Sequence, residues 1–376
     1  MTLPTSPPTV RASALVKGVA PCETNEDCRL RYLYHKERCS DGLARSCSKD
    51  ASSPLWTACR RGSGSDCDLW ASVFMSAWQS PKAGFPMVHW HRPRRESMAM
   101  SEHPEYRNPR FTAADIPDSR VTSVADPFLV EQNGHWFLFF EMFDLETQRG
   151  EIGLAQSEDA LHWTYSGPVL KEPFHLSYPF VCKDGDDYYM VPESRAVREV
   201  RLYRAVKFPM EWALDRVLFC GRYVDTSIIA FKGKWWAFAT RHPYTMEIWY
   251  SDELSGPWKP HALNPICFFD KSRARSGGRP VVLGNKVLRF VQDSRGGYGR
   301  SLRAYLVDVL DVDRFEEHPV EPDPLLSPMG STWARNGMHH FAPVPTSTGK
   351  WFASVDGSGD GRREPEPEAT PADLAP

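Results

Sequence analysis

The sequence predicts an all-β chain whose main part is a five-bladed β-propeller. A short apolar strand, a glycine-containing turn and an aromatic-rich strand recur five times along the chain. The turn glycines are Gly134, Gly185, Gly233, Gly284 and Gly349. The first four lie about fifty residues apart, a period typical of propeller blades, and an insertion around residues 311–332 delays the fifth. Radial repetition of such units is favoured because it leaves few exposed sheet edges.

Each repeat is long enough for three to four antiparallel strands. The hairpin segments read DPFLVEQNGHWFLFFE, YPFVCKDGDDYYMVPE, SIIAFKGKWWAFATR, RPVVLGNKVLRFVQD and HFAPVPTSTGKWFASVD. A third strand follows the first three hairpins (EIGLAQS, EVRLYRA, MEIWYSD), and each of these units then ends on a tryptophan, Trp163, Trp212 or Trp258. We expect these aromatic residues to pack between blades rather than to hold a ligand.

The ends of the chain lack this rhythm, which predicts three regions. Residues 1–105 form an irregular Cys-rich region, 106–357 the propeller and 358–376 a disordered, Pro-rich tail. The segment NPRFTAADIPD is predicted to close the ring against the last blade. Six cysteines lie in the first region. Their spacings match no zinc pattern, so they fit either a disulfide framework or free thiols. They are Cys22, Cys28, Cys39, Cys47, Cys59 and Cys67.

Composition excludes two classes of partner. The net charge of −3 and isoelectric point near 6.5 lack the basic excess of a nucleic-acid-binding protein. No apolar run approaches the roughly 18 residues of a membrane span, so we expect no transmembrane segment. The hydrophobic share of 41% is ample for a packed core.

Propeller geometry places polar residues of all five blades at one mouth, because the first strand of each blade lines the central channel and the second strand returns to the same end. The inner ring is predicted to be Asp126, Tyr178, Asp225, Arg279 and His340. The outer ring is predicted to be Glu141, Glu193, Arg241, Asp293 and Asp356. Such a funnel suits a hydroxyl-rich ligand, although carboxylates at strand ends also cap turns or pair with arginine.

Asp126 and Asp225 are the most specific pair in this funnel. Pro127 restricts the backbone of Asp126 and so fixes where its carboxylate points. Asp225 lies two blades away, in V-D-T-S-I-I. Two carboxylates that face each other across a channel can act as a base and a partner that sets its pKa.

This pattern resembles the family 43 glycoside hydrolases. The resemblance implies that Asp126 is the general base, that Asp225 tunes the pKa of the acid, and that His339 or His340 is the histidine of blade five. The family's acid is a blade-four glutamate, but blade four here reads S-G-G-R-P-V-V, with Gly278 or Arg279 in that place. Arginine is not a useful proton donor near neutral pH, so hydrolysis would need a displaced acid, Glu193 or Glu141.

Residues from about 106 to 357 also resemble the N-terminal propeller-like domain of plant and algal glucosamine inositolphosphorylceramide transferases. The motifs include VADPFLVEQNGHWFLFFE, HLSYPFVCKDGDDYYMVPES and QDSRGGYGRSLR. The resemblance implies a glycan or glycolipid headgroup as ligand, a partner transferase, and the Golgi or secretory pathway. No metal or cofactor is expected, since the lone D-V-D at 311–313 reads as a turn.

The sequence therefore predicts a glycan-binding or accessory domain of glycosphingolipid glycosylation. Two alternatives stay open: an active glycoside hydrolase of the furanosidase type, and a fragment of a glycosyltransferase without its catalytic domain. Whether the chain is an enzyme is not decided by the sequence.

Overall fold

The computed structural model confirms an all-β propeller. It describes residues 108–328, 333–345 and 351–359, together with three short strands at 83–85, 87–90 and 100–101. The six N-terminal cysteines and the predicted tail from residue 360 lie outside the described residues. Within the described residues there is no helix with the length and hydropathy of a membrane span.

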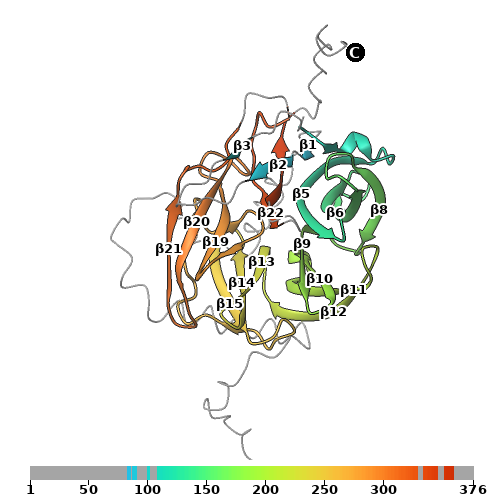
Figure 1. The fold of residues 1–376 in the computed structure, drawn as a ribbon. Coiled ribbons are helices and arrows are strands. Elements are labelled where there is room, and N and C mark those ends of the chain that lie inside the picture. Colours follow the sequence, from blue (N-terminus) through green and yellow to red (C-terminus); the bar gives the residue numbers. More distant parts are fainter. Residues whose placement is uncertain are drawn as a thin grey trace, which may run out of the picture.

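The sheets follow one another around a central axis (Figure 1). The first sheet holds β5 (Val121–Gln132), β6 (His135–Asp144), β7 (Arg149–Ser157) and β8 (Thr164–Leu170). The second holds β9 (Ser177–Asp184), β10 (Asp187–Glu193), β11 (Glu199–Lys207) and β12 (Glu211–Cys220). The third holds β13 (Tyr223–Phe231), β14 (Lys234–Arg241), β15 (Thr245–Ser251) and β16 (Lys259–Pro260).

The fourth sheet holds β17 (Arg275–Ser276), β18 (Val281–Leu283), β19 (Lys286–Asp293), β20 (Ser301–Leu310) and β21 (Phe315–Val320). The fifth holds β22 (Phe341–Pro345), β23 (Trp351–Val355), β2 (Met87–Trp90) and β3 (Met100–Ser101). A smaller sheet joins β24 (Gly357–Ser358), β1 (Ala83–Phe85) and β4 (Phe111–Thr112). Two short 3-10 turns complete the described elements, η1 (Ala113–Asp115) and η2 (Arg195–Val197).

The sheets are not five equal blades. Four of them have four strands, whereas the fourth sheet has five because its innermost strand is split into β17 and β18. The split falls at Gly278, which has a φ of +138° and forms a parallel bridge with Phe341 of the fifth sheet. A Cβ atom at Gly278 would lie 1.9 Å from the Phe341 carbonyl oxygen. Only glycine permits this close approach.

The closing strand differs from the prediction. β2 pairs with β23 and completes the fifth sheet, so part of the region set apart as irregular contributes two strands to the ring. The predicted segment at 108–118 instead gives β4, which pairs with β1 in the smaller sheet. β4 is only two residues long because Thr112 and Asp115 form a capping box that starts η1.

The hydrophobic core is divided among the spaces between successive sheets. Five clusters of buried side chains lie between the first and second, second and third, third and fourth, fourth and fifth, and fifth and first sheets. Trp258 belongs to one of these clusters, and Trp163 and Trp212 pack against two others, as the sequence predicted. Contact of every sheet with two neighbours closes the ring and fixes its channel.

Candidate functional site at the mouth of the ring

Three of the innermost strands carry the same backbone irregularity at the mouth. Asp126, Tyr178 and Asp225 each have a positive φ, of 53°, 47° and 48°. In each case the pairing with the next strand shifts register at this point, which marks a β-bulge. A left-handed backbone is unfavourable for side chains of this size and is typical of functional sites. The bulges therefore aim the three side chains in a way that a regular strand would not.

A cluster of four buried carboxyl groups occupies the mouth: Asp126, Glu141, Glu193 and Asp225. Their residues are 1–9% exposed. Asp225 accepts hydrogen bonds from the guanidinium of Arg275 and, at 2.8 Å, from Nε2 of Gln292. Glu193 also hydrogen-bonds with Asp225. The predicted residues Asp126, Asp225, Glu193 and Glu141 are thus brought together.

Three of these carboxyl groups hold their protons unusually tightly. Burial raises the pKa of Asp126 to about 7, although the charge of His339 opposes the shift. Burial also raises the pKa of Glu193 to about 7, and the neighbouring Asp225 adds to the effect. For Glu141, burial and the charges of Asp126 and Glu193 raise the pKa well above its ordinary value. Near neutral pH the mouth therefore offers both proton donors and proton acceptors.

His339 provides a positive charge beside this cluster. Its Nδ1 lies 2.8 Å from Asp356 and 4.0 Å from Asp126. Burial alone would lower the pKa of His339, but the carboxylate of Asp356, with a smaller effect from Asp126, raises it to about 9. Asp356 also accepts the backbone N–H groups of His339 and His340 at 3.1 and 3.0 Å, so it positions the start of β22.

This ion pair predicts a stability that depends on pH. The pKa of His339 is higher in the folded than in the unfolded protein, so its contribution is complete below about pH 6.5 and is lost by about pH 9. We expect the free energy of unfolding to fall by on the order of 2–3 kcal/mol across this interval. Urea denaturation at pH 7 and pH 9 would measure most of the fall. His339→Asn should remove it, whereas a control at the exposed His135 should not; an equal slope in both variants would contradict the assignment.

A metal is not the function that we assign to these residues. Asp126, His339 and Asp356 place potential ligand atoms within 4.8 Å of one another. A histidine that binds a metal does so as the neutral imidazole, and the Asp356 carboxylate raises the pKa of His339 to about 9. In the structure two of these three residues, His339 and Asp356, form an ion pair.

Three residues predicted to bind substrate make contacts between the sheets of the ring. Tyr178 is fully buried, and its hydroxyl bonds Ser227 at 2.8 Å and the Gly278 carbonyl at 2.9 Å across the channel. Arg279 donates to carbonyl oxygens of β9 and β5 at 2.7 and 3.3 Å and lies over two phenylalanine rings. His340 is fully buried, with its ring against Phe128. These side chains thus tie strands of different sheets together.

Arg241 and Asp293 also lie apart from the cluster. Arg241 pairs with Glu247 at 2.7 Å, and Asp293 pairs with Arg295 at 2.6 Å. The preceding residues, Thr240 and Gln292, occupy the positions equivalent to Glu141 and Glu193. A step of one residue along a strand reverses the face on which a side chain lies. At these two positions the structure therefore places the preceding residue, rather than the predicted one, on the face equivalent to that of Glu141 and Glu193.

Arg275 and Gln292 are the site residues that the sequence analysis missed. They are directly opposite each other in the β17–β19 pair, and both contact Asp225. The hairpin sequence could have indicated this part of the chain. Matching residues in pairs outward from the turn at Gly284 leads back past Arg279 to the segment that contains Arg275, the partner of Gln292, whereas taking the residue before the first apolar run leads to Arg279. Blade four therefore presents a cation to the mouth, where the resemblance to family 43 glycoside hydrolases implies an acid.

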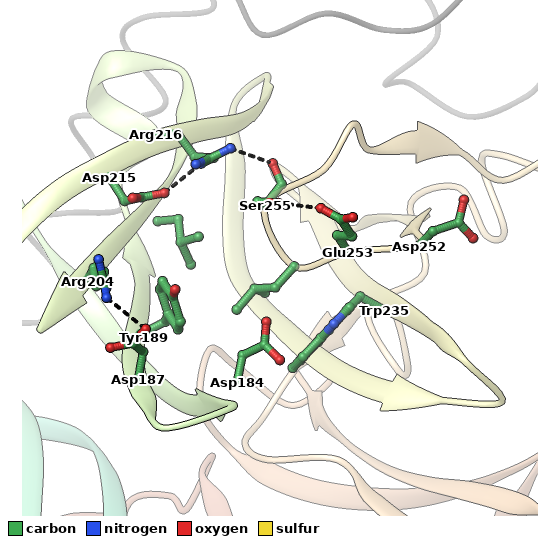
Figure 2. Close-up of a pocket in the computed structure, with 12 residues that line it drawn as sticks. Asp184, Asp187, Tyr189, Arg204, Asp215, Arg216, Trp235, Asp252, Glu253 and Ser255 are labelled. Atoms are coloured by element: carbon green, nitrogen blue, oxygen red, sulfur yellow. Dashed lines mark hydrogen bonds and ion pairs between the residues drawn. The ribbon is translucent and has the colours of Figure 1, made fainter.

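A second cavity, of about 460 Å³, opens between the second and third sheets at the opposite end of the strands (Figure 2). Tyr189 and Trp235 lie on its walls. Its carboxylates are Asp184, Asp187, Asp215, Asp252 and Glu253. Its two arginines, Arg204 and Arg216, are paired with Asp187 and Asp215. Asp252 is paired with Lys234, so the cavity keeps a small excess of negative charge, from Asp184 and Glu253.

The fold and the mouth define a class, a propeller with a buried cluster of acidic groups at one end of its channel. The fold is shared with β-1,2-mannobiose phosphorylase from Listeria innocua, with a TM-score of 0.50 and 14% identity over 72% of this chain and 96% of the other. An exo-β-1,3-galactanase from Clostridium thermocellum has a TM-score of 0.49 and 13% identity, over 71% of this chain and 66% of that one.

Sequence similarity defines the family more narrowly. Residues 66–358 match the family described as glucosamine inositolphosphorylceramide transferase 1, N-terminal, and the chain belongs to this family. It is 41% identical over 273 residues to glucosamine inositolphosphorylceramide transferase 1 of Oryza sativa subsp. japonica, a match that covers 68% of this chain and 37% of that protein. The Arabidopsis thaliana protein of the same name is 36% identical over 66% of this chain and 34% of its own length. The chain thus spans about a third of these relatives.

Proposed function

We propose that the mouth of the ring binds a sugar ring of a glycan or glycolipid headgroup. The observation that carries this proposal is the gathering of Asp126, Glu141, Glu193 and Asp225 with the cations Arg275 and His339 at one end of the channel. Carboxylates accept hydrogen bonds from hydroxyl groups, and protonated carboxyl, guanidinium and imidazolium groups donate them. A polyol that both donates and accepts along its rim complements such a set.

Family membership supports a glycolipid headgroup as the ligand. The relatives are named as transferases that act on inositolphosphorylceramide, and this chain matches about a third of their length. We propose that the propeller recognises the headgroup as an accessory domain while a partner transferase domain carries out the transfer. Arg275 and His339 suit a headgroup that includes a phosphate, because both are cations with hydrogen-bond donors.

Binding in solution tests this proposal. Isothermal titration calorimetry with inositol phosphate, free inositol, and furanoside and pyranoside glycans would be run on the wild type and on Asp126→Ala. Removal of one carboxyl group that hydrogen-bonds the sugar should weaken binding about 10- to 100-fold. Asp186→Ala is the matched control, because Asp186 is exposed in the β9–β10 turn at the opposite end of the ring. Equal affinity of all three proteins for every ligand would contradict the proposal.

A glycoside hydrolase is the second candidate function. The observation that favours it is the hydrogen bond between Glu193, whose pKa is raised to about 7, and Asp225. In this proposal Glu193 is the general acid, Asp126 the general base and Asp225 the partner that keeps Glu193 protonated. A turnover assay with furanosides and pyranosides separates the two functions: sugar binding without turnover identifies a recognition domain. Adding inositolphosphorylceramide with a nucleotide sugar tests the transferase alternative.

A further inference from the structure

The end of the ring that carries the mouth also exposes a pair of aromatic rings. Phe268 and Phe269 are 67% and 59% exposed and pack edge to face, with ring centroids 4.5 Å apart. They lie in the connection between β16 and β17. Phe269 has a φ of +53°, an unfavourable backbone conformation for a bulky residue. Strain that keeps two large apolar side chains in solvent indicates that they contact something outside the chain.

Backbone hydrogen bonds hold this loop at the rim of the mouth. The Met246 N–H donates to the Cys267 carbonyl, and the Asp270 N–H donates to the Tyr244 carbonyl, each at 3.0 Å. Met246 and Tyr244 lie at the start of β15, where the third sheet turns at the mouth. The aromatic pair is therefore a fixed part of this rim.

Basic side chains continue the rim on both sides of the pair. Arg198, Arg222 and Lys271 are exposed, and among the described residues they form no ion pair with a carboxylate. Their segments are joined in series: Gly221 N–H to the Arg198 carbonyl at 2.8 Å, His242 N–H to the Arg222 carbonyl at 3.0 Å, and Ser294 N–H to the Lys271 carbonyl at 2.8 Å. The nearby acidic residues Asp270 and Asp293 are paired with arginines.

We propose that this surface, named here the basic aromatic rim (Arg198, Arg222, Phe268, Phe269 and Lys271), docks the domain on an anionic lipid bilayer. Aromatic rings favour the interface between headgroups and acyl chains, and lysine and arginine are attracted to anionic headgroups. The opposite end of the ring keeps a small excess of negative charge around its cavity, so the same field repels it from the surface. The mouth then faces the membrane. This inference rests on the proposed function, because a mouth turned to the bilayer can receive a headgroup in place.

Vesicle co-sedimentation of the full chain tests the proposal. The vesicles are phosphatidylcholine alone, or phosphatidylcholine with about one-third phosphatidylserine. We expect binding only to the anionic vesicles, reduced by raised salt because the attraction is partly electrostatic. The double variants Phe268→Ser/Phe269→Ser and Arg222→Glu/Lys271→Glu should each bind about tenfold more weakly.

Two matched controls locate the effect on the rim. Val206→Ser removes an apolar side chain that is 69% exposed near the far end of β11, and Lys259→Glu reverses an exposed charge in β16. Both should bind anionic vesicles like the wild type. The proposal is overturned if the rim variants and these controls bind equally, or if the phenylalanine variant loses affinity only for a soluble glycan, which would make the pair a sugar platform.

The same assay separates this proposal from the function of the mouth. Asp126→Ala should lose affinity for soluble headgroups in calorimetry and keep its binding to anionic vesicles. The rim variants should lose binding to anionic vesicles and keep their affinity for soluble headgroups in calorimetry. A failure of one proposal is therefore visible without a failure of the other.

Discussion

Replacing Arg275 by methionine is expected to destabilise the fold by about 3–5 kcal/mol, because it removes one partner of a buried ion pair. Asp225 is 1% exposed, and Arg275 provides its positive counter-charge. Without the guanidinium, the Asp225 carboxylate keeps only the 2.8 Å hydrogen bond from Gln292 and the contact with Glu193. Urea unfolding followed by tryptophan fluorescence measures the loss. Sugar binding should fall as well, because the arrangement of acids around Asp225 depends on its charge.

A double-mutant cycle shows whether the loss comes from this pair. Asp225→Asn added to Arg275→Met removes the uncompensated charge, so it should restore part of the lost stability. The control is Arg216→Met, at an exposed arginine paired with Asp215, where a change below about 1 kcal/mol is expected. A double variant as unstable as the sum of its single variants would show that Arg275 acts through packing alone.

The repeat of strands and turns could be predicted from the sequence because each hairpin is specified by residues that are close together in the chain. Alternating apolar residues around Gly134, Gly185 and Gly233 define three hairpins, and each is present. The closing strand could not be predicted in this way. β2 pairs with β23, more than 250 residues away, and such non-local pairing leaves no signature in either segment alone.

Site residues could be predicted where an apolar run shows the start of the innermost strand. They could not be predicted where a break in that strand changes the register. Asp126 and Asp225 each come directly before a run of apolar residues, and the structure places both at the mouth. In blade four the innermost strand is split at Gly278. The residue at the mouth is therefore Arg275, before the split, and Arg279, after it, bonds to strands of other sheets deeper in the ring. A bulge or break shifts, by one or more residues, which position of a strand lies at the mouth. The pattern of hydrophobic residues does not show such a shift.

These corrections change the chemistry of the mouth rather than its location. Blade four contributes the guanidinium of Arg275, which pairs with Asp225, and in blade two burial and the neighbouring Asp225 raise the pKa of Glu193 to about 7. The site combines donors and acceptors from all five sheets. This arrangement serves recognition of a polyol directly, and it serves proton transfer only if Glu193 can reach a leaving oxygen.

Glu193→Gln separates these two uses of the same group. Burial and Asp225 raise the pKa of Glu193 to about 7, so below that pH it is a neutral donor that glutamine reproduces in shape and hydrogen bonding. We expect sugar affinity at pH 6 to change by less than about threefold. Above pH 7 the wild type loses protons from both Glu193 and Asp126, whose pKa is also raised to about 7. The fall in sugar affinity with rising pH should therefore reflect ionisation of both Glu193 and Asp126 in the wild type. In the variant it should reflect ionisation of Asp126 alone. Turnover, if the wild type has any, should drop by about 100- to 10,000-fold, because glutamine cannot release a proton.

The matched control for this variant is Glu253→Gln, at an exposed glutamate in the cavity at the opposite end of the ring. It should leave both the affinity and its pH dependence unchanged. Loss of binding at pH 6 in Glu193→Gln would show that the mouth needs the Glu193 carboxylate in its charged form. Retained binding with an unaltered pH profile would assign the titration near pH 7 to Asp126 alone, because that carboxyl would be the remaining group whose charge the sugar senses.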